Sequence, residues 1–253
     1  MHSYLDHAVS ERERLTDLSD NHPAIGHWRE LIAANGDQLP DFPLPLGAPE
    51  GTPQRTGRMW LLDGAGASEF DRGCRSHGGN AATGIFACLA LAGTTLANQR
   101  QFHTLAPFHT RYDLWSMRSV GWYVGMSPVS FRVADTLPEI PRAARLELKR
   151  AKKTAQVPFS KAMELLGTAL RDRFMVSYMD NRTVPGSDFW PHWRARFLIS
   201  RSSDAYETYL WVSRWQHGIS VNFRHPGSAV ARSAMDDYLA EVAAQAHLIL
   251  RLA

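Results

Sequence analysis

The chain has 253 residues, of which 44% are hydrophobic and 21% are charged, and its formal net charge is +3. This length allows one large domain or two small ones. With 28 basic residues against 25 acidic ones, the charge is too balanced to indicate a nucleic-acid-binding protein. Cys74 and Cys88 form neither a disulfide framework nor a metal motif. The first residues lack the apolar core of a secretion signal, and no uncharged apolar run approaches the ~20 residues of a membrane span.

The first part of the chain is predicted to form two helices followed by an extended linker. Apolar residues recur at helical spacing over residues 3–18, and Pro23 suits the first turn of a second helix that ends near Ala34. Five of the 14 prolines fall within residues 40–53, which indicates an extended connection. Both helices are charged on one face and only thinly apolar on the other.

These features divide the chain into two regions. Residues 1–53 form helices and a proline-rich linker, and residues 54–253 form one domain of strands and helices. Because the first two helices have thin apolar faces, we expect residues 1–53 to pack poorly on the larger domain. Proteases should therefore cut first between Asn35 and Arg55.

In the larger domain, helices first alternate with strands, and a run of strands follows. The expected strands are 58–62, 102–108, 120–131, 174–179, 195–200, 208–213 and 219–223. The expected helices are 68–76, 81–97, 138–153, 159–170 and 228–250. Ser68 is the expected N-cap of the first of these helices. This order predicts an α/β fold, a two-layer sandwich with a mixed β-sheet.

Several short motifs suggest chemistry but lack the partners that the chemistry needs. Residues 76–79 (SHGG) resemble part of an oxyanion loop, yet the sequence has no G-x-S-x-G nucleophile elbow, so a glycine turn before a helix is the better interpretation. His103 and His109 share one strand region without carboxylates at ligand spacing, so we expect no metal site. The sequence has no G-x-x-x-x-G-K loop for a phosphate, and we expect no cofactor.

Residues 118–123 (RSVGWY), followed by Pro128 and Val129, resemble the S/T-V-G-W-F…P-V segment of condensation domains. The resemblance lies closest to the mycobacterial polyketide-synthase-associated acyltransferases. Other segments resemble that family in the same order along the chain: 3–13, 39–47, 105–111, 175–180 and 226–232. Residues 3–13 match the helix that follows the catalytic motif of the family, and residues 39–47 match the linker between its two lobes.

The resemblance implies the C-terminal lobe of a chloramphenicol-acetyltransferase-like fold. The implied activity is transfer of a fatty or polyketide-derived acyl group from a thioester, on a carrier protein or CoA, to an alcohol such as a trehalose glycolipid. The family's H-H-x-x-x-D-G motif precedes the segment that residues 3–13 match, so we expect a separate or missing N-terminal lobe. The expected location is the reduced cytoplasm, as the cysteine usage indicates, with peripheral contact with the inner membrane as a further expectation. The alternatives are a non-catalytic truncated relic or accessory module, and an unrelated α/β binding domain.

The resemblance also assigns roles to residues of the strand pair 102–131. Five of them are expected to be structural or to line the cleft between the lobes: Arg111, Arg118, Ser119, Gly121 and Trp122. Either Arg111 or Arg118 is expected to carry a buried charge facing the missing lobe, because the aspartate of the family's motif pairs with a cation.

His109 is the minor candidate for a catalytic base. His109 and Asp113 have the H-x-x-x-D spacing, but Phe108 stands where the motif has its first histidine, and Leu114 stands where it has glycine. A strand position also favours a structural role for His109. We therefore expect no catalytic residue in this chain and no acyl transfer by the chain alone.

Overall fold

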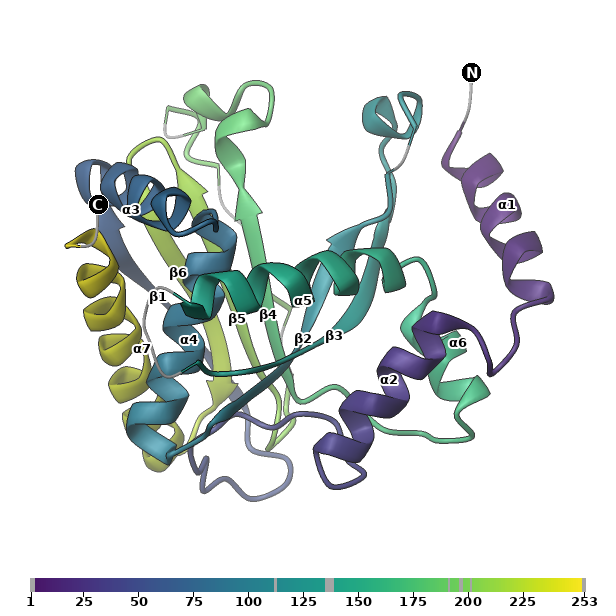
Figure 1. The fold of residues 1–253 in the computed structure, drawn as a ribbon, viewed down its shortest axis with the longest axis horizontal. Coiled ribbons are helices and arrows are strands. Elements are labelled where there is room, and N and C mark those ends of the chain that lie inside the picture. The colour runs from purple at the N-terminus through teal and green to yellow at the C-terminus, as the bar shows by residue number, and fades with distance from the viewer. Residues whose placement is uncertain are drawn as a thin grey trace.

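The computed structural model describes residues 3–111, 113–134, 139–190, 192–195, 198–200 and 202–251. It has two layers, a six-stranded sheet and a layer of helices that covers one face of it (Figure 1). Parallel and antiparallel strand pairs both occur in the sheet. The predicted α/β sandwich with a mixed sheet is therefore confirmed.

The sheet has the strand order β1-β6-β5-β4-β2-β3. Its strands are β1 (Gln54–Asp63), β2 (Gln101–His109), β3 (Val124–Arg132), β4 (Phe174–Asp180), β5 (Thr208–Trp215) and β6 (Gly218–Pro226). Strand β4 is parallel to β2 and to β5, and the other neighbours are antiparallel. The carboxyl ends of β2, β4 and β5 therefore lie at the same end of the sheet, at the top in Figure 1.

Four helices form the layer over the sheet: α3 (Gly64–Ser76), α4 (Ala81–Ala97), α5 (Ile140–Thr154) and α7 (Ala229–Leu250). Helix α4 packs against α7 and α5 and is buried along most of its length. Its many Ala and Gly residues let these helices approach closely over the inward side chains of β4 and β5, such as Val176, Leu210 and Val212. Among the described residues, no single helix has the length and apolar character of a membrane span; only the α3–α4 pair, bent by 91°, meets those criteria when its two helices are joined.

The N-terminal helices differ in how they pack, and this corrects the expectation for residues 1–53. Helix α1 (Tyr4–Thr16) has no buried residue. Helix α2 (Pro23–Ala34) buries Ile25, Trp28 and Leu31 in a second apolar cluster, together with Leu105 of β2 and with α6 (Phe159–Leu165). The prediction of poor packing is therefore wrong for α2, because its short apolar face fits a matching cluster at the β3 edge of the sheet.

The proline-rich linker is also anchored on the larger domain. Leu39 belongs to the cluster around α2, and Phe42 is 5% exposed in the main core. The Phe42 ring meets the rings of Phe174 and Tyr238 edge-on, at centroid distances of 5.6 and 4.9 Å. The segment is extended, as the prolines predict, and the apolar residues that alternate with the prolines are buried against the larger domain.

Some element boundaries differ from those expected. Helix α3 begins at Gly64, and its N-cap is Asp63, whose Oδ1 accepts from the backbone N–H of Gly66 at 2.8 Å, so the prediction of Ser68 as the cap is wrong. Strand β3 begins only at Val124, and α6 ends at Leu165. The described residues of 195–200 are not in a strand, and residues 196 and 197 lie outside the described part.

Candidate functional site

The loop that joins β2 to β3, residues 110–123, is held in shape by Arg111 and Asp113. The Arg111 guanidinium donates to the carbonyl oxygens of Ser116 and Ser119, the latter at 2.7 Å, and lies 4.1 Å from the centre of the Tyr123 ring. Asp113 Oδ1 accepts from the backbone N–H groups of Trp115 and Ser116 at 2.9 and 2.7 Å. These contacts give the loop a defined conformation.

Two of the sequence-predicted site residues thus have structural contacts within this loop. Arg111 binds backbone carbonyls and Ser119 provides one of them, so Arg111 does not present an uncompensated charge. The side chain of Arg118 lies outside the described residues, and its role as a cleft-facing charge stays a prediction. That these residues line a cleft between two lobes also stays a prediction.

Two glycines of this segment allow close approaches of the backbone to neighbouring elements. A Cβ at Gly125 would overlap the carbonyl oxygen of Ala155, and a Cβ at Gly121 would overlap the ring of Tyr4. The pairing of β2 with β3 is continuous at Gly125, which faces Phe108, so no bulge is present there. Gly125 therefore lets the end of α5 lie against β3, and Gly121 lets α1 lie against the loop.

The apolar side chains of this loop point into solvent, contrary to the expected buried strand from residue 120. The exposed fractions are 85% for Leu114, 64% for Trp115, 63% for Met117, 95% for Val120 and 73% for Trp122. We call these five residues the hairpin tip. Several large apolar side chains exposed on one loop are typical of a surface that another molecule or domain covers.

His109 stands at the exposed end of β2. Burial and the nearby Lys152 cation lower its pKa below the usual value, although the Arg111 backbone partly offsets this effect. The ring is therefore mostly neutral near pH 7, which is the form a base requires. However, among the described residues no carboxylate pairs with it, and the Asp113 oxygen that the motif would supply caps the loop instead. His109 at the end of β2 and Asp113 in the following loop are therefore near each other in sequence, but no hydrogen bond or ion pair between them is found among the described residues.

The other short motifs have structural roles. Residues 76–79 end α3 and make a turn in which Gly78 has a φ of +73°, as the glycine-turn interpretation predicts. His103 is buried, its pKa is lowered by burial, and its Nδ1 lies 3.0 Å from the hydroxyl of Ser130. Within the described ranges, no three His, Cys, Asp or Glu side chains are arranged to hold a metal ion.

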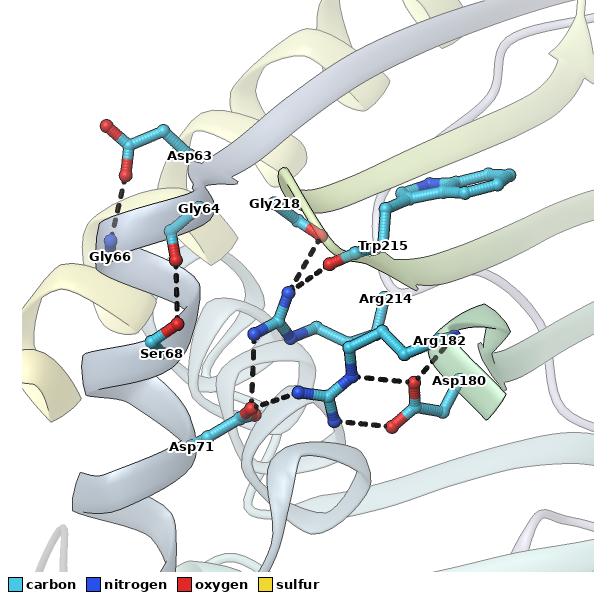
Figure 2. A network of polar contacts seen from close by, with 10 residues as sticks. All are labelled: Asp63, Gly64, Gly66, Ser68, Asp71, Asp180, Arg182, Arg214, Trp215 and Gly218. Carbon is cyan, nitrogen blue, oxygen red and sulfur yellow. Dashed lines mark hydrogen bonds and ion pairs between the residues drawn. The ribbon is translucent and has the colours of Figure 1, made fainter. Parts of the chain in front are cut away.

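A network of charged residues lies at the carboxyl ends of β4 and β5 (Figure 2). Asp71 of α3 contacts Arg214 at 3.2 Å and Arg182 at 2.9 Å through the same oxygen, Oδ2. Arg182 also makes a two-pronged contact with Asp180, at 2.8 Å from Nε and 2.6 Å from Nη2. Asp71 and Arg214 are only 4% and 2% exposed. The network therefore fixes the loop after β4 to helix α3.

Sequence reasoning missed this network, although a signal for it exists. In β5, Leu210, Val212 and Arg214 alternate with residues of the other face, so Arg214 must point into the same core as two buried aliphatic residues. A charge at such a position needs a buried partner. The partner could not be identified from the sequence, because Asp71 lies 143 positions away.

Comparison with known proteins gives consistent matches. No protein-family model matches the chain. Among curated proteins, it is 29% identical over 247 residues to the trehalose-2-sulfate acyltransferase PapA2 of Mycobacterium tuberculosis, which covers 94% of this chain and 52% of that protein. It is 26% identical to the acyltransferase PapA3 of the same organism, again over 94% of this chain and 52% of the relative. The chain thus spans about half the length of these relatives.

Solved structures show the same relation. A structure of a PapA2 acyl transferase superposes with a TM-score of 0.85 at 25% identity and covers 98% of this chain and 56% of its own. A condensation domain for chain release from the enacyloxin polyketide synthase superposes with a TM-score of 0.72 at 14% identity, over 98% of this chain and 51% of its own. The chain therefore has the fold of about half a condensation domain, and in sequence it is similar to mycobacterial acyltransferases.

Proposed function

We propose that this chain is the C-terminal lobe of a condensation-type acyltransferase. In this proposal it acts with an N-terminal lobe, on the same or another polypeptide, that carries the catalytic H-H-x-x-x-D-G motif. The observation that carries the proposal is the match of 94% of the chain to only 52% of a trehalose-2-sulfate acyltransferase. A TM-score of 0.85 supports the same relation at the level of the fold.

The hairpin tip supports the need for a second lobe. Arg111 and Asp113 form hydrogen bonds with the backbone of this loop. In the resulting conformation the five apolar side chains of the hairpin tip are exposed. Exposed apolar area favours association by about 25 cal/mol per Å² that is buried. Helix α1 contributes to the same argument, because Leu5 and Val9 are 73% and 57% exposed.

The proposed reaction is transfer of a fatty or polyketide-derived acyl group from a thioester to a sugar alcohol. The donor would be carried by a carrier protein or by CoA, and trehalose is the acceptor class suggested by the relative's name. The N-terminal lobe would supply the histidine that takes the proton from the attacking hydroxyl. The chain described here would supply one wall of the site, which orients the acceptor and excludes water.

An acyl-transfer assay tests the proposal. The purified chain is incubated with a long-chain acyl-CoA and trehalose, alone and with the N-terminal half of the Mycobacterium tuberculosis trehalose-2-sulfate acyltransferase as a separate polypeptide. We expect no turnover by the chain alone, because general-base assistance contributes about 10²–10⁴-fold and positioning contributes further. Turnover should begin when the second lobe is added.

Two outcomes would reject the proposal. Turnover by the chain alone that is lost in His109→Ala would make His109 the catalytic base. A complex of the two lobes that binds both substrates without turnover would favour a non-catalytic accessory module. As a control, His247→Ala removes an exposed histidine from the last turn of α7, in the helix layer, and should leave the rate unchanged.

A further inference from the structure

Helix α5 concentrates the positive charge of the chain on one exposed face. The helix holds six of the 28 basic residues but only one of the 25 acidic residues, and that one, Glu147, is buried. The rest of the chain therefore has slightly more acidic than basic residues. We call the six exposed residues the basic face of α5: Arg142, Arg145, Lys149, Arg150, Lys152 and Lys153.

The basic face does not serve the stability of the helix. Lys149 lies one turn from both Arg145 and Lys153, and like charges at this spacing destabilise a helix. Arg142 lies in the first turn, where the positive end of the helix dipole disfavours a cation. Only the last turn, with Lys152, gains from the dipole. Such an arrangement indicates that the basic face interacts with another molecule.

Contacts within the chain hold two residues of the basic face in place. Arg150 pairs with Glu30 of α2 at 2.6 Å, and Arg145 donates to the carbonyl oxygen of Gly78 at 2.7 Å. Over the described ranges, no carboxylate pairs with the other four residues: Arg142, Lys149, Lys152 and Lys153. A partner of opposite charge would therefore meet four cations whose charge no ion pair in that part of the chain compensates.

The basic face suits an acidic protein surface better than a membrane. Leu146 is 68% exposed and lies one turn from Arg142 and Lys149, and an apolar contact inside a charged rim is typical of protein interfaces. A membrane-surface helix turns its apolar side to the lipid, whereas Ile140 and Ala151 on the apolar side of α5 are buried in the main core. An extended anionic surface would also repel the acidic excess of the remaining chain.

The spread of the cations also argues against a single small anion. Arg142 and Lys153 lie 11 positions apart on α5, which is about 16 Å along the helix axis. The phosphates of one CoA molecule are clustered and would contact only part of this length. A row of carboxylates on a helix of a partner protein matches it better.

The basic face ends beside the loop of residues 110–123. The carboxyl-terminal end of α5 lies next to β2 and β3 (Figure 1), and the carbonyl oxygen of Ala155, which follows the helix, lies against Gly125 of β3. Lys152 is close enough to His109, at the end of β2, for its charge to lower the pKa of that histidine. A partner docked on α5 therefore lies beside the loop whose tip the proposed second lobe covers.

We propose that the basic face of α5 docks an acidic surface of the carrier protein that brings the acyl thioester. This inference rests on the proposed function and names its donor as a carrier protein rather than CoA. Carboxylates of the carrier pair with the four cations that lack an ion pair, and Leu146 packs against an apolar residue of the carrier. The docked carrier presents its thioester to the cleft between the lobes from the side of α5.

Binding of a carrier protein to the purified chain tests the docking surface without catalysis. The probe is an acidic acyl carrier protein in its phosphopantetheinylated form, labelled with a fluorophore and followed by fluorescence anisotropy. We expect saturable binding that weakens as the salt concentration rises, because exposed charges are screened. The double variant Lys149→Glu/Lys153→Glu should bind roughly tenfold more weakly or worse. Leu146→Ser should also weaken binding, because it removes the apolar contact.

Matched variants separate the effect of charge from an effect on folding. Lys149→Arg/Lys153→Arg keeps both charges and should retain binding. Arg232→Glu reverses the charge of an exposed residue of α7, on the other side of α4, and should leave binding unchanged. Unfolding midpoints of the variants should stay close to that of the wild type, which shows that the variants remain folded.

Three results would overturn the inference. These are no binding of the carrier protein at low salt, equal affinity of the wild type and Lys149→Glu/Lys153→Glu, or binding to vesicles of anionic lipid without binding to the carrier, which would identify a membrane contact.

The assay of the two-lobe mixture separates this inference from the proposed function. A KM that rises in Lys149→Glu/Lys153→Glu for an acyl carrier protein, but not for acyl-CoA, would support both. Transfer from the acyl carrier protein with an unchanged KM in this variant would reject the docking surface alone. Carrier binding that depends on Lys149 and Lys153, without transfer by the mixture, would reject the proposed function alone.

Discussion

Four charged side chains meet where β4 and β5 end, and two of them are almost completely buried. Asp71 bridges Arg214 and Arg182 through one oxygen, and Arg182 reaches on to Asp180. Burial of such charges contributes little net stability when all partners are present. The network instead specifies the conformation of the loop after β4, because all four side chains form their ion pairs in only one position of that loop.

Removal of Asp71 should therefore be costly. We expect Asp71→Ala to destabilise the chain by about 3–5 kcal/mol, because Arg214 remains buried without its carboxylate. Glu69→Ala is the control on the same helix: Glu69 and Arg72 are more than half exposed and 3.7 Å apart, so the change should stay within about 0.5 kcal/mol. Urea unfolding measures both. Equal effects of the two variants would contradict the role of the network.

The network also predicts acid sensitivity. The hydrogen bond from Arg182 lowers the pKa of Asp180 below its usual 3.8. A carboxyl whose pKa is lower in the folded state stabilises that state above the usual pKa, and this contribution is lost as the pH falls through the folded-state pKa. We expect Arg182→Gln to lower the free energy of unfolding at neutral pH. We also expect the variant to lose less of this free energy than the wild type when the pH falls below about 4. Unfolding curves over this pH range measure the change. An identical acid loss in wild type and variant would contradict this assignment.

Gly125 shows how a single residue sets the distance between two elements. A side chain there would overlap the Ala155 carbonyl at the end of α5, so Gly125→Ala should destabilise the chain by about 1–3 kcal/mol. Gly26 in α2 has open space around it, and Gly26→Ala should be neutral or stabilise by up to about 1 kcal/mol. Thermal unfolding compares the two variants. If both variants destabilised the chain equally, crowding against the Ala155 carbonyl would not explain the effect of Gly125→Ala.

At the scale of elements, α2 and α5 are joined by a buried polar chain. His27 of α2 lies with Nε2 2.8 Å from Glu147 and Nδ1 2.9 Å from Thr154, both on α5. Thr154 in turn lies 2.7 Å from the hydroxyl of Ser127 on β3. Because these groups are buried, the hydrogen bonds of the His27 ring to α5 are satisfied only while α2 stays in place.

Loss of His27 should release α2 from the domain. We expect His27→Leu to cost about 1–3 kcal/mol for each polar group left without a partner. The exposed ion pair of Glu30 with Arg150, 2.6 Å, joins the same two helices, so Glu30→Ala is a matched control that should cost under about 1 kcal/mol. Hydrogen exchange of α2 amides, together with urea unfolding, measures the effect. Unchanged exchange in His27→Leu would contradict the anchoring role.

Elements were predictable from sequence where pattern and burial agree. The alternation in β6 and the apolar run of α4 identify a strand and a buried helix correctly. Residues 120–123 were misassigned because Val and Trp favour strands, whereas here the Arg111 contacts hold a loop that exposes them. The start of α3 was missed because Gly64 and Gly66 are poor helix formers, and the Asp63 cap compensates for them.

At the scale of the whole molecule, the weakest attachment is α1. It has no buried residue, whereas α2 and the linker are anchored by Trp28, Leu39 and Phe42. We therefore expect trypsin to cut first at Arg12 or Arg14, and this replaces the expected first cut between Asn35 and Arg55. Mass spectrometry of the early fragments identifies the site. Early cleavage at Arg55 with α1 intact would contradict this order.

The central claim is that this chain is one lobe, whose hairpin tip a second lobe covers. Hydrogen exchange of residues 113–122, measured with and without the N-terminal half of the Mycobacterium tuberculosis trehalose-2-sulfate acyltransferase, tests it most directly. The account predicts slower exchange in this loop on mixing, and a complex that weakens in Trp115→Ser and Trp122→Ser but not in Trp60→Ser, an exposed tryptophan of β1. No complex, or a complex that leaves exchange in the loop unchanged, would contradict the account.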